Sequence, residues 1–166
     1  MLSLWKVRTG AVRRAVPRYI RRMALNLIKL CVGAESVEDL EDWIALRPEE
    51  KRRAGVVVEH FHTTRMVPKR VDELLDGGSL YWVIKGGVQC RQRLVDIRPF
   101  TDGEGIGRCH LVFDPQVVRT QWQPRRPFQG WRYLVPADTP TDLGGADAGE
   151  ELPLNLRREL SELGLL

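Results

Sequence analysis

The segment that spans residues 77–100 constrains the fold most strongly, because it reads as two strands joined by a tight turn. In residues 79–85 large side chains alternate between two faces, the pattern of a half-buried strand. Gly86 and Gly87 follow directly and can adopt the positive φ angles that a tight hairpin turn requires. The segment therefore predicts an antiparallel pair of strands in the core.

The returning strand of this hairpin carries an unusual amount of positive charge. Its apolar positions change parity between the first and the second half, which predicts a bulge between Arg91 and Leu94. Lys85 precedes the glycine pair, and Arg91 and Arg93 follow it. We expect the turn and the bulge to direct these three cations to one surface.

The other apolar segments predict short strands and helices around the hairpin. Strands are expected at residues 25–32, 56–62 and 109–113, and helices after a capping Ser36 and from Pro68. Short strands joined mostly by turns favour antiparallel pairing. The predicted fold class is α+β, with a mostly antiparallel sheet that curls toward a barrel and two or three short helices.

The 166 residues fit one domain of ordinary size, with distinct segments on both sides. Residues 1–22 form a basic N-terminal extension with seven Lys or Arg and no acid, which we interpret as a segment before a start at Met23, a nucleic-acid arm or a targeting sequence. Residues 23–135 are the predicted globular domain. Residues 136–151 are a predicted flexible acidic linker, and residues 152–166 a predicted amphipathic helix that docks on the domain or binds a protein partner.

The charge distribution favours an anionic partner for the centre of the chain. After the first 22 residues, 19 basic residues face 22 acidic ones. From His60 to Leu134, however, 12 Lys or Arg face seven Asp or Glu. A basic centre between acidic flanks suits a polyanion, although a solvated surface has the same composition.

The cysteines and the hydropathy indicate a cytoplasmic protein. The three cysteines, Cys31, Cys90 and Cys109, are widely spaced, which disfavours both a disulfide framework and a zinc knuckle. Free cysteines at apolar positions are typical of a reducing compartment. No apolar run approaches the about 20 residues that a membrane span needs, so no membrane partner is expected.

Three literal runs carry a resemblance to a known family. They read MALNLIKLCVGAESVEDLEDW, HTTRMVPKRVDELLDGGSLYWVIKGGVQCRQR and RRPFQGWRYL. In these runs, which span residues 23–134, the chain resembles the bacterial, alphaproteobacterial-type Domain of Unknown Function 1489 family. This resemblance implies a bacterial cytoplasmic protein and brings no activity with it.

A second resemblance concerns the fold alone. A helix that ends in Leu-x-x-Gly, followed by a strand and a basic strand, is similar to PUA-like pseudobarrels and their ASCH relatives. That likeness implies a pseudobarrel that binds RNA or modified bases, or hydrolyses small amides. Fold likeness alone does not establish function.

The candidate site combines the hairpin with the basic residues before and after it. Phosphates can approach a glycine turn, cations can neutralise them, and an aromatic ring can stack a base. The predicted ligand contacts are His62, Arg65, Lys69, Arg70, Tyr81, Lys85, Arg91, Arg93, Arg125 and Arg126. They predict a small domain that binds RNA or a nucleotide. If instead the aromatic residue packs in the core and the cations are ordinary surface charges, the chain is a structural or protein-interaction domain.

The sequence leaves catalysis open. Lys85 could act as a base if burial lowered its pKa, with Asp96 or Glu73 as proton carrier, as in an ASCH-like amidohydrolase. His60 and His62 share a face of their strand, a spacing that metal sites use, but sequence places no third ligand beside them. We interpret them as structural and predict neither a metal nor a cofactor.

Overall fold

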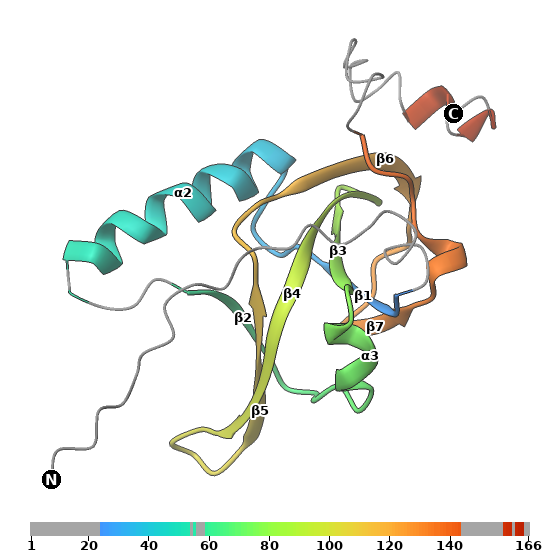
Figure 1. Cartoon of the computed structure of the whole chain (residues 1–166). Coiled ribbons are helices and arrows are strands. Elements are labelled where there is room, and N and C mark those ends of the chain that lie inside the picture. The colour runs from blue at the N-terminus through green and yellow to red at the C-terminus, as the bar shows by residue number, and fades with distance from the viewer. Residues whose placement is uncertain (1–23, 54, 56–58, 144–157, 161, 165–166) are drawn as a thin grey trace, which may run out of the picture.

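A seven-stranded sheet organises the chain in the computed structural model, which describes residues 24–53, 55, 59–143, 158–160 and 162–164 (Figure 1). The strand order is β2-β5-β4-β3-β1-β7, and β6 pairs with β4 outside this path. The elements in chain order are β1 (Asn26–Leu30), α2 (Val37–Arg53), β2 (His60–Thr64), α3 (Val71–Leu75), β3 (Ser79–Ile84), β4 (Gly87–Thr101), β5 (Gly107–Phe113), β6 (Val118–Pro124), β7 (Trp131–Leu134) and the 3-10 helix η1 (Pro136–Asp138).

The predicted α+β class is confirmed. β1 and β3 are parallel, and the other pairings among the described strands are antiparallel. The strand path does not close on itself, so the curled-sheet form of the prediction holds and the closed pseudobarrel does not. None of the described helices is long and apolar enough to cross a membrane.

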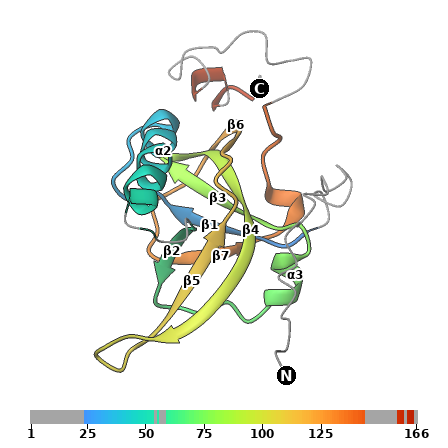
Figure 2. The same cartoon turned by 60° about the vertical axis from the view of Figure 1, so that its left-hand side comes forward.

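The 15-residue strand β4 belongs to both halves of the sheet. Its first half pairs with β3 and β6, and its second half pairs with β5, which in turn pairs with β2. Figure 2 shows the curvature of β4 and the β4–β5 hairpin that projects from the body. Because β4 bends, β2 and β5 form a second wall beside the β3–β1–β7 wall.

Two bulges produce the parity change in β4, and neither lies at the predicted position between Arg91 and Leu94. Gln89 has no partner residue in the register with β3, and Val95 has none in the register with β5. A bulge moves the following side chains to the other face. Val88 therefore packs in the smaller core cluster, while Cys90 packs in the larger one.

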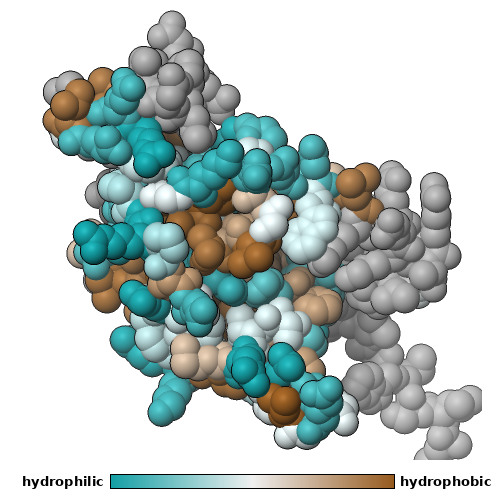
Figure 3. Space-filling model, turned by 180° about the vertical axis from the view of Figure 1, so that it is seen from behind, coloured by the Kyte–Doolittle hydropathy of each residue, from teal (hydrophilic) through white to brown (hydrophobic). Residues whose placement is uncertain are grey.

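The larger core cluster lies between α2 and the sheet. Val37 and Leu40 of α2 are buried against residues such as Leu80 and Leu111, which face inward from β3 and β5. The predicted cap is confirmed, because Ser36 Oγ accepts a hydrogen bond of 3.1 Å from the backbone N–H of Asp39. On the face seen from behind in Figure 3, hydrophobic residues gather near the centre and hydrophilic residues surround them.

The segment after β7 differs from the predicted flexible linker over residues 136–143. Asp142 forms a bridge with Thr120, and the backbone N–H of Leu143 donates to Arg119 O at 2.8 Å. These bonds attach residues 142 and 143 to β6, beyond the predicted end of the globular domain at residue 135. Residues 144–151 and the basic extension 1–22 lie outside the described residues.

Only part of the predicted C-terminal helix over residues 152–166 is described. Residues 158–160 are helical. The Arg158 guanidinium lies 5.8 Å from the ring centroid of Trp122 on β6. This contact is a cation–π distance, and it brings the segment to the body of the domain.

Candidate functional site

The β3–β4 hairpin turn has Lys85 and Gly86 as its two central residues. Their φ angles are +46° and +80°, so the left-handed pair is Lys85–Gly86 rather than the predicted Gly86–Gly87. A two-residue turn with two positive φ angles matches the right-handed twist of the flanking strands. Lys85 is the one non-glycine residue with positive φ among the described residues.

Gly87 is needed for a different reason. A Cβ atom at this position would lie 2.2 Å from Nε1 of Trp122. The indole of β6 therefore packs directly on the backbone at the start of β4. This close approach fixes the end of β6 beside the hairpin turn.

Arg125 and Arg126 follow β6, and Arg125 lies beside the turn formed by Lys85 and Gly86. The backbone N–H of Arg125 donates to Gly86 O at 2.9 Å, and Gly87 pairs with Pro124. We call the set Lys85, Arg125 and Arg126 the basic corner. Segments about 40 positions apart in the sequence thus place three cations at one end of the sheet.

The electrostatics of the basic corner leave it positive. Among the described residues its side chains form one ion pair, in which Lys85 Nζ lies 3.5 Å from Glu35 Oε2. Both partners are more than half exposed, so water and salt screen this pair strongly. Arg125 Nη2 donates to Gln123 Oε1 at 3.2 Å, a neutral partner. Three cations and one exposed carboxylate leave a net charge of about +2.

Arg91 and Tyr81 do not join this surface, because both are buried. The Arg91 guanidinium donates to both carboxylate oxygens of Asp142 at 2.7 Å and to Ser79 Oγ at 2.9 Å. The bonds to Asp142 raise the pKa of Arg91 above its usual range against the opposing effect of burial. Tyr81 packs in the smaller core cluster. The prediction that Arg91 presents its charge at the surface is therefore wrong.

The remaining predicted cations lie toward the opposite end of β3. Arg93 pairs with Ser79 at the start of β3, whereas Lys85 follows its last residue. Six strand residues separate these ends by about 20 Å. Lys69 and Arg70 lie beside α3, where their backbone N–H groups donate to the Tyr133 hydroxyl at 2.9 and 3.2 Å.

Arg65, Lys69 and Arg70 are exposed near α3 and form a second basic group, which we call the α3 group. Arg70 is paired there with Glu73 at 2.5 Å. The α3 group and the basic corner do not converge, contrary to the single surface that the sequence predicted. The structure thus brings together Lys85, Arg125 and Arg126 only.

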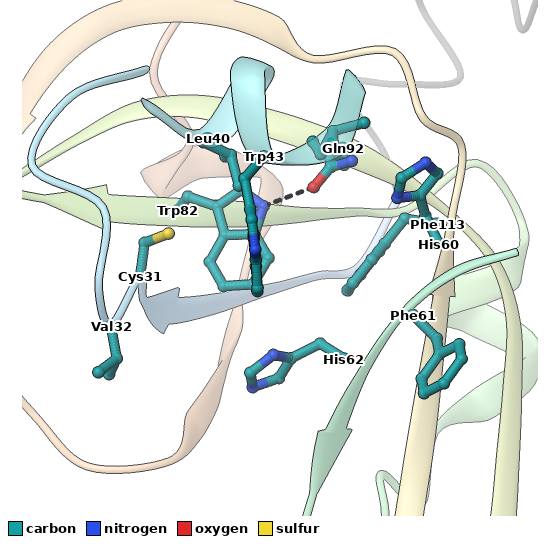
Figure 4. Close-up of a pocket in the computed structure, with 11 residues that line it drawn as sticks. Cys31, Val32, Leu40, Trp43, His60, Phe61, His62, Trp82, Gln92 and Phe113 are labelled. Atoms are coloured by element: carbon teal, nitrogen blue, oxygen red, sulfur yellow. Dashed lines mark hydrogen bonds between the residues drawn. The ribbon is translucent and has the colours of Figure 1, made fainter. Parts of the chain in front are cut away.

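His62 lies in a separate cavity of about 60 Å³ between α2, β2 and the sheet. Figure 4 shows the rings of Trp82, Trp43, Phe113 and His62 around it. Trp82 is held in place because its Nε1 donates to Gln92 Oε1 at 2.9 Å. His62 and Phe113 contact the Trp82 ring edge-on, at centroid distances of 5.8 and 5.9 Å. The cavity is mostly aromatic, with few polar groups.

The groups that could support catalysis do not assemble with Lys85. The Lys85 side chain is 56 % exposed at the turn. Hydrogen bonds from Arg98 lower the pKa of Asp96, and those from Arg70 lower the pKa of Glu73. A proton carrier works best with a pKa near neutrality. The two carboxylates are therefore poorly suited to that role.

The cavity likewise lacks the features of a metal or thiol site. No group of three or more His, Cys, Asp or Glu residues that could hold a metal ion occurs among the described residues. Burial raises the pKa of the Cys31 thiol to about 11. The thiol is therefore protonated at neutral pH and is a weak nucleophile.

Lys29 is a partly buried cation on the core side of β1 that does not belong to the predicted site residues. It occurs in β1 between Leu27 and Cys31, both of which belong to the larger core cluster. Since alternate residues of a strand share a face, Lys29 points to the core side. A charged residue at a core position of a buried strand is the sequence signal that marks it.

Comparison with known proteins identifies the family. The model of the family described as "Protein of unknown function (DUF1489)" matches residues 27–166. The chain belongs to this family. The match includes the acidic segment and the C-terminal residues, and so extends beyond the 23–134 region of the literal runs. No curated protein and no solved structure matches the chain.

Proposed function

We propose that the protein binds RNA through the basic corner. The observation that carries the proposal is the hydrogen bond from the Arg125 N–H to Gly86 O, which joins two basic segments at one exposed end of the sheet. Lys85, Arg125 and Arg126 then present three cations within reach of a common strand of phosphates. Phosphate contacts supply most of the affinity in such complexes.

The conformation of Lys85 supports this proposal. A left-handed non-glycine residue costs about 1 kcal/mol, and asparagine or glycine would occupy the same turn with less strain. The exposed lysine at φ +46° gains no compensating burial in the fold. Strain that the fold does not need is found preferentially at functional positions.

The proposed RNA is single-stranded or contains single-stranded loops. The basic corner is a narrow turn, whereas recognition of a duplex uses contacts across successive grooves. Three phosphates bound to three cations should give a slope of about −2 for the logarithm of affinity against the logarithm of salt concentration. The corner alone reads phosphate, so the proposed binding depends weakly on base sequence.

A cytoplasmic location is part of the same proposal. Cys31, Cys90 and Cys109 are all free and buried. Burial raises the pKa of each of the three thiols. Three thiols used as small core residues suit a reducing compartment, where RNA is also present.

The direct test is a fluorescence-anisotropy titration of a labelled single-stranded RNA at several salt concentrations. It should use the full chain and, in parallel, residues 23–166, because the seven basic residues of segment 1–22 bind any polyanion. The proposal predicts binding by the shorter chain with a salt slope of about −2. Binding that is confined to the full chain would assign the affinity to the basic extension instead.

The amidohydrolase alternative has less support, because Lys85, Asp96 and Glu73 do not form one site. A screen of small amides and nucleosides tests it. Turnover that Lys85→Ala abolishes without unfolding would favour that alternative over RNA binding.

A further inference from the structure

We propose that Arg132 and Phe128 form a platform beside the basic corner, on which a base of the bound RNA stacks. This platform rests on the RNA binding proposed above and adds a contact to a base, whereas the basic corner contacts phosphates alone. Three features of the structure carry the proposal: the contact between the two side chains, the free guanidinium of Arg132 and the position of the pair near the three cations.

The Arg132 guanidinium lies over the Phe128 ring, with Cζ 4.6 Å from the ring centroid. The ring itself packs against the smaller core cluster, which includes Ile28, Tyr81 and Val83. The core thus holds the ring in place, and the ring holds the guanidinium. A planar guanidinium stacks on aromatic rings, and unpaired RNA bases stack on guanidinium planes. The outer side of Arg132 is therefore suited to a base.

Arg132 is exposed, and its guanidinium pairs with no carboxylate in the part of the chain that the structure describes. Arg70 makes a similar contact, with Cζ 5.7 Å from the Tyr133 ring centroid, but Arg70 is also paired with Glu73. A guanidinium without a carboxylate partner keeps its charge and its donors for a ligand. Arg132 differs in this respect from an arginine that is occupied within the fold.

The loop between β6 and β7 carries the ring from the basic corner to the edge of the sheet. The backbone N–H of Arg125 donates to Gly86 O at 2.9 Å, and Phe128 follows three residues later. Gly130, with a φ angle of +72°, precedes β7 and Arg132. One short loop therefore holds a cation for phosphate and a ring for the platform.

The register of the sheet gives the separation between the platform and the hairpin turn. Ile28 of β1 pairs with both Arg132 and Tyr81, so these two residues lie at the same level of the sheet. Lys85 is four positions beyond Tyr81. Arg132 is thus about 13 Å from Lys85 along the strands and about 10 Å across them. A single strand of a few nucleotides spans this separation.

The platform selects an unpaired base. Bases within a duplex are stacked on their neighbours, whereas bases of single strands and loops can stack on protein side chains. Stacking of this kind tolerates any base, because every base has a π-face. The ligand is therefore single-stranded RNA with at least one unstacked base, and its sequence matters little.

The experiment compares two labelled single strands of equal length by fluorescence anisotropy with the full chain. One strand is an oligouridylate, and the other is the same sugar-phosphate strand without bases. Both carry the same phosphates, so the ratio of their affinities measures the contribution of the bases. The wild type should bind the oligouridylate at least about fivefold more tightly.

Arg132→Lys keeps the charge and removes the guanidinium plane, so it should reduce this ratio to less than about twofold without changing the salt dependence. Arg70→Lys is the matched control, because it makes the same exchange in another exposed arginine that lies over an aromatic ring. It should keep the wild-type ratio. Phe128→Leu removes the ring beneath the guanidinium and should also lower the ratio, with its fold checked by thermal unfolding.

Two results would overturn the platform and leave RNA binding by the basic corner intact. One is equal affinity of the wild type for the two strands. The other is a ratio that Arg132→Lys does not change, which would assign the base contact to another part of the chain, such as segment 1–22. Binding that is lost altogether in residues 23–166 would instead contradict RNA binding by the basic corner, and the platform with it.

Discussion

Arg91 holds Asp142 through two parallel hydrogen bonds, with Nε and Nη2 each 2.7 Å from one carboxylate oxygen. The two residues are 51 positions apart, and the pair attaches the segment after β7 to the first half of β4. Planar bidentate pairs of this kind are stronger and more directional than single ion pairs. Arg91 is thus a structural residue, and its charge belongs to the fold rather than to a ligand site.

Arg91→Met should destabilise the protein by about 2–4 kcal/mol, because it removes both hydrogen bonds from the Arg91 guanidinium to the Asp142 carboxylate. We expect a loss of unfolding free energy toward the lower end of the range for buried ion pairs, because the Asp142 side chain is 29 % exposed. Urea unfolding measures the loss.

The matched control is Arg93→Met, at a partly exposed position two residues further along β4, which should change stability by less than about 0.5 kcal/mol. The double variant Arg91→Met with Asp142→Leu should be more stable than the sum of the single losses predicts. Equal losses for Arg91→Met and Arg93→Met would contradict the structural role of the pair.

Lys85→Asn should stabilise the protein by about 0.5–1 kcal/mol and weaken RNA binding at the same time. Asparagine tolerates the left-handed conformation better than lysine, so the strain at φ +46° is relieved while one cation is lost. Thermal unfolding and anisotropy on the same preparation measure the two effects. A variant that is less stable than the wild type would show that the Lys85 side chain supports the fold.

Gly87→Ala should cost about 1–3 kcal/mol, because its new methyl group would overlap the Trp122 indole and force that ring to move. Gly103→Ala is the control, since a Cβ there has no atom within 4 Å. It should shift stability by no more than about 0.5 kcal/mol. If both variants unfold at the same urea concentration, the packing of Trp122 on β4 is not as described.

The Cys31 thiol predicts a loss of stability at alkaline pH. Burial raises its pKa from 9.0 to about 11, so between these values the unfolded chain releases a proton that the folded chain keeps. The contribution of this thiol to the free energy of unfolding is fully present below pH 9 and is lost as the pH rises through 11. The loss is about 2 kcal/mol near pH 11. Lys29 acts in the opposite direction, because burial lowers its pKa and the cost of its charge disappears as it deprotonates.

Comparing the wild type with Cys31→Ala isolates the thiol, since Lys29 is present in both. The stability advantage of the wild type should shrink by about 2 kcal/mol between about pH 8 and pH 10.5 in urea unfolding. An advantage that is independent of pH would show that the thiol is not buried.

The fold was largely predictable because local patterns determine it. The alternation in residues 79–85, the Ser36 cap and the strand at β5 depend on neighbours in sequence. The positions at which β4 changes its register with its partner strands were not predictable. The bulges at Gln89 and Val95 depend on three different partner strands. Sequence also cannot show that Asp142, far along the chain, neutralises Arg91.

The candidate site was predictable only in part for the same reason. Lys85 was recognisable as the last residue of a strand before a glycine turn, and RRPF as a basic segment. Their proximity depends on the packing of Trp122 on Gly87, which is a contact between distant segments. The cavity depends on where α2 crosses the sheet, which no local pattern in the sequence shows.

The most direct test of RNA binding is a comparison of two charge-reversed variants of residues 23–166. One carries Lys85→Glu, Arg125→Glu and Arg126→Glu in the basic corner. The other carries Arg65→Glu, Lys69→Glu and Arg70→Glu in the α3 group, and so changes the net charge equally. Both should retain the wild-type fold, because all six side chains are at least partly exposed.

Anisotropy titration with single-stranded RNA should show at least a tenfold loss of affinity, about 1.4 kcal/mol, in the basic-corner variant, together with a flatter salt dependence. The α3-group variant should lose less than threefold. Equal losses in the two variants would mean that the RNA responds only to net charge. That result, or affinity that neither variant changes, would contradict RNA binding at the basic corner.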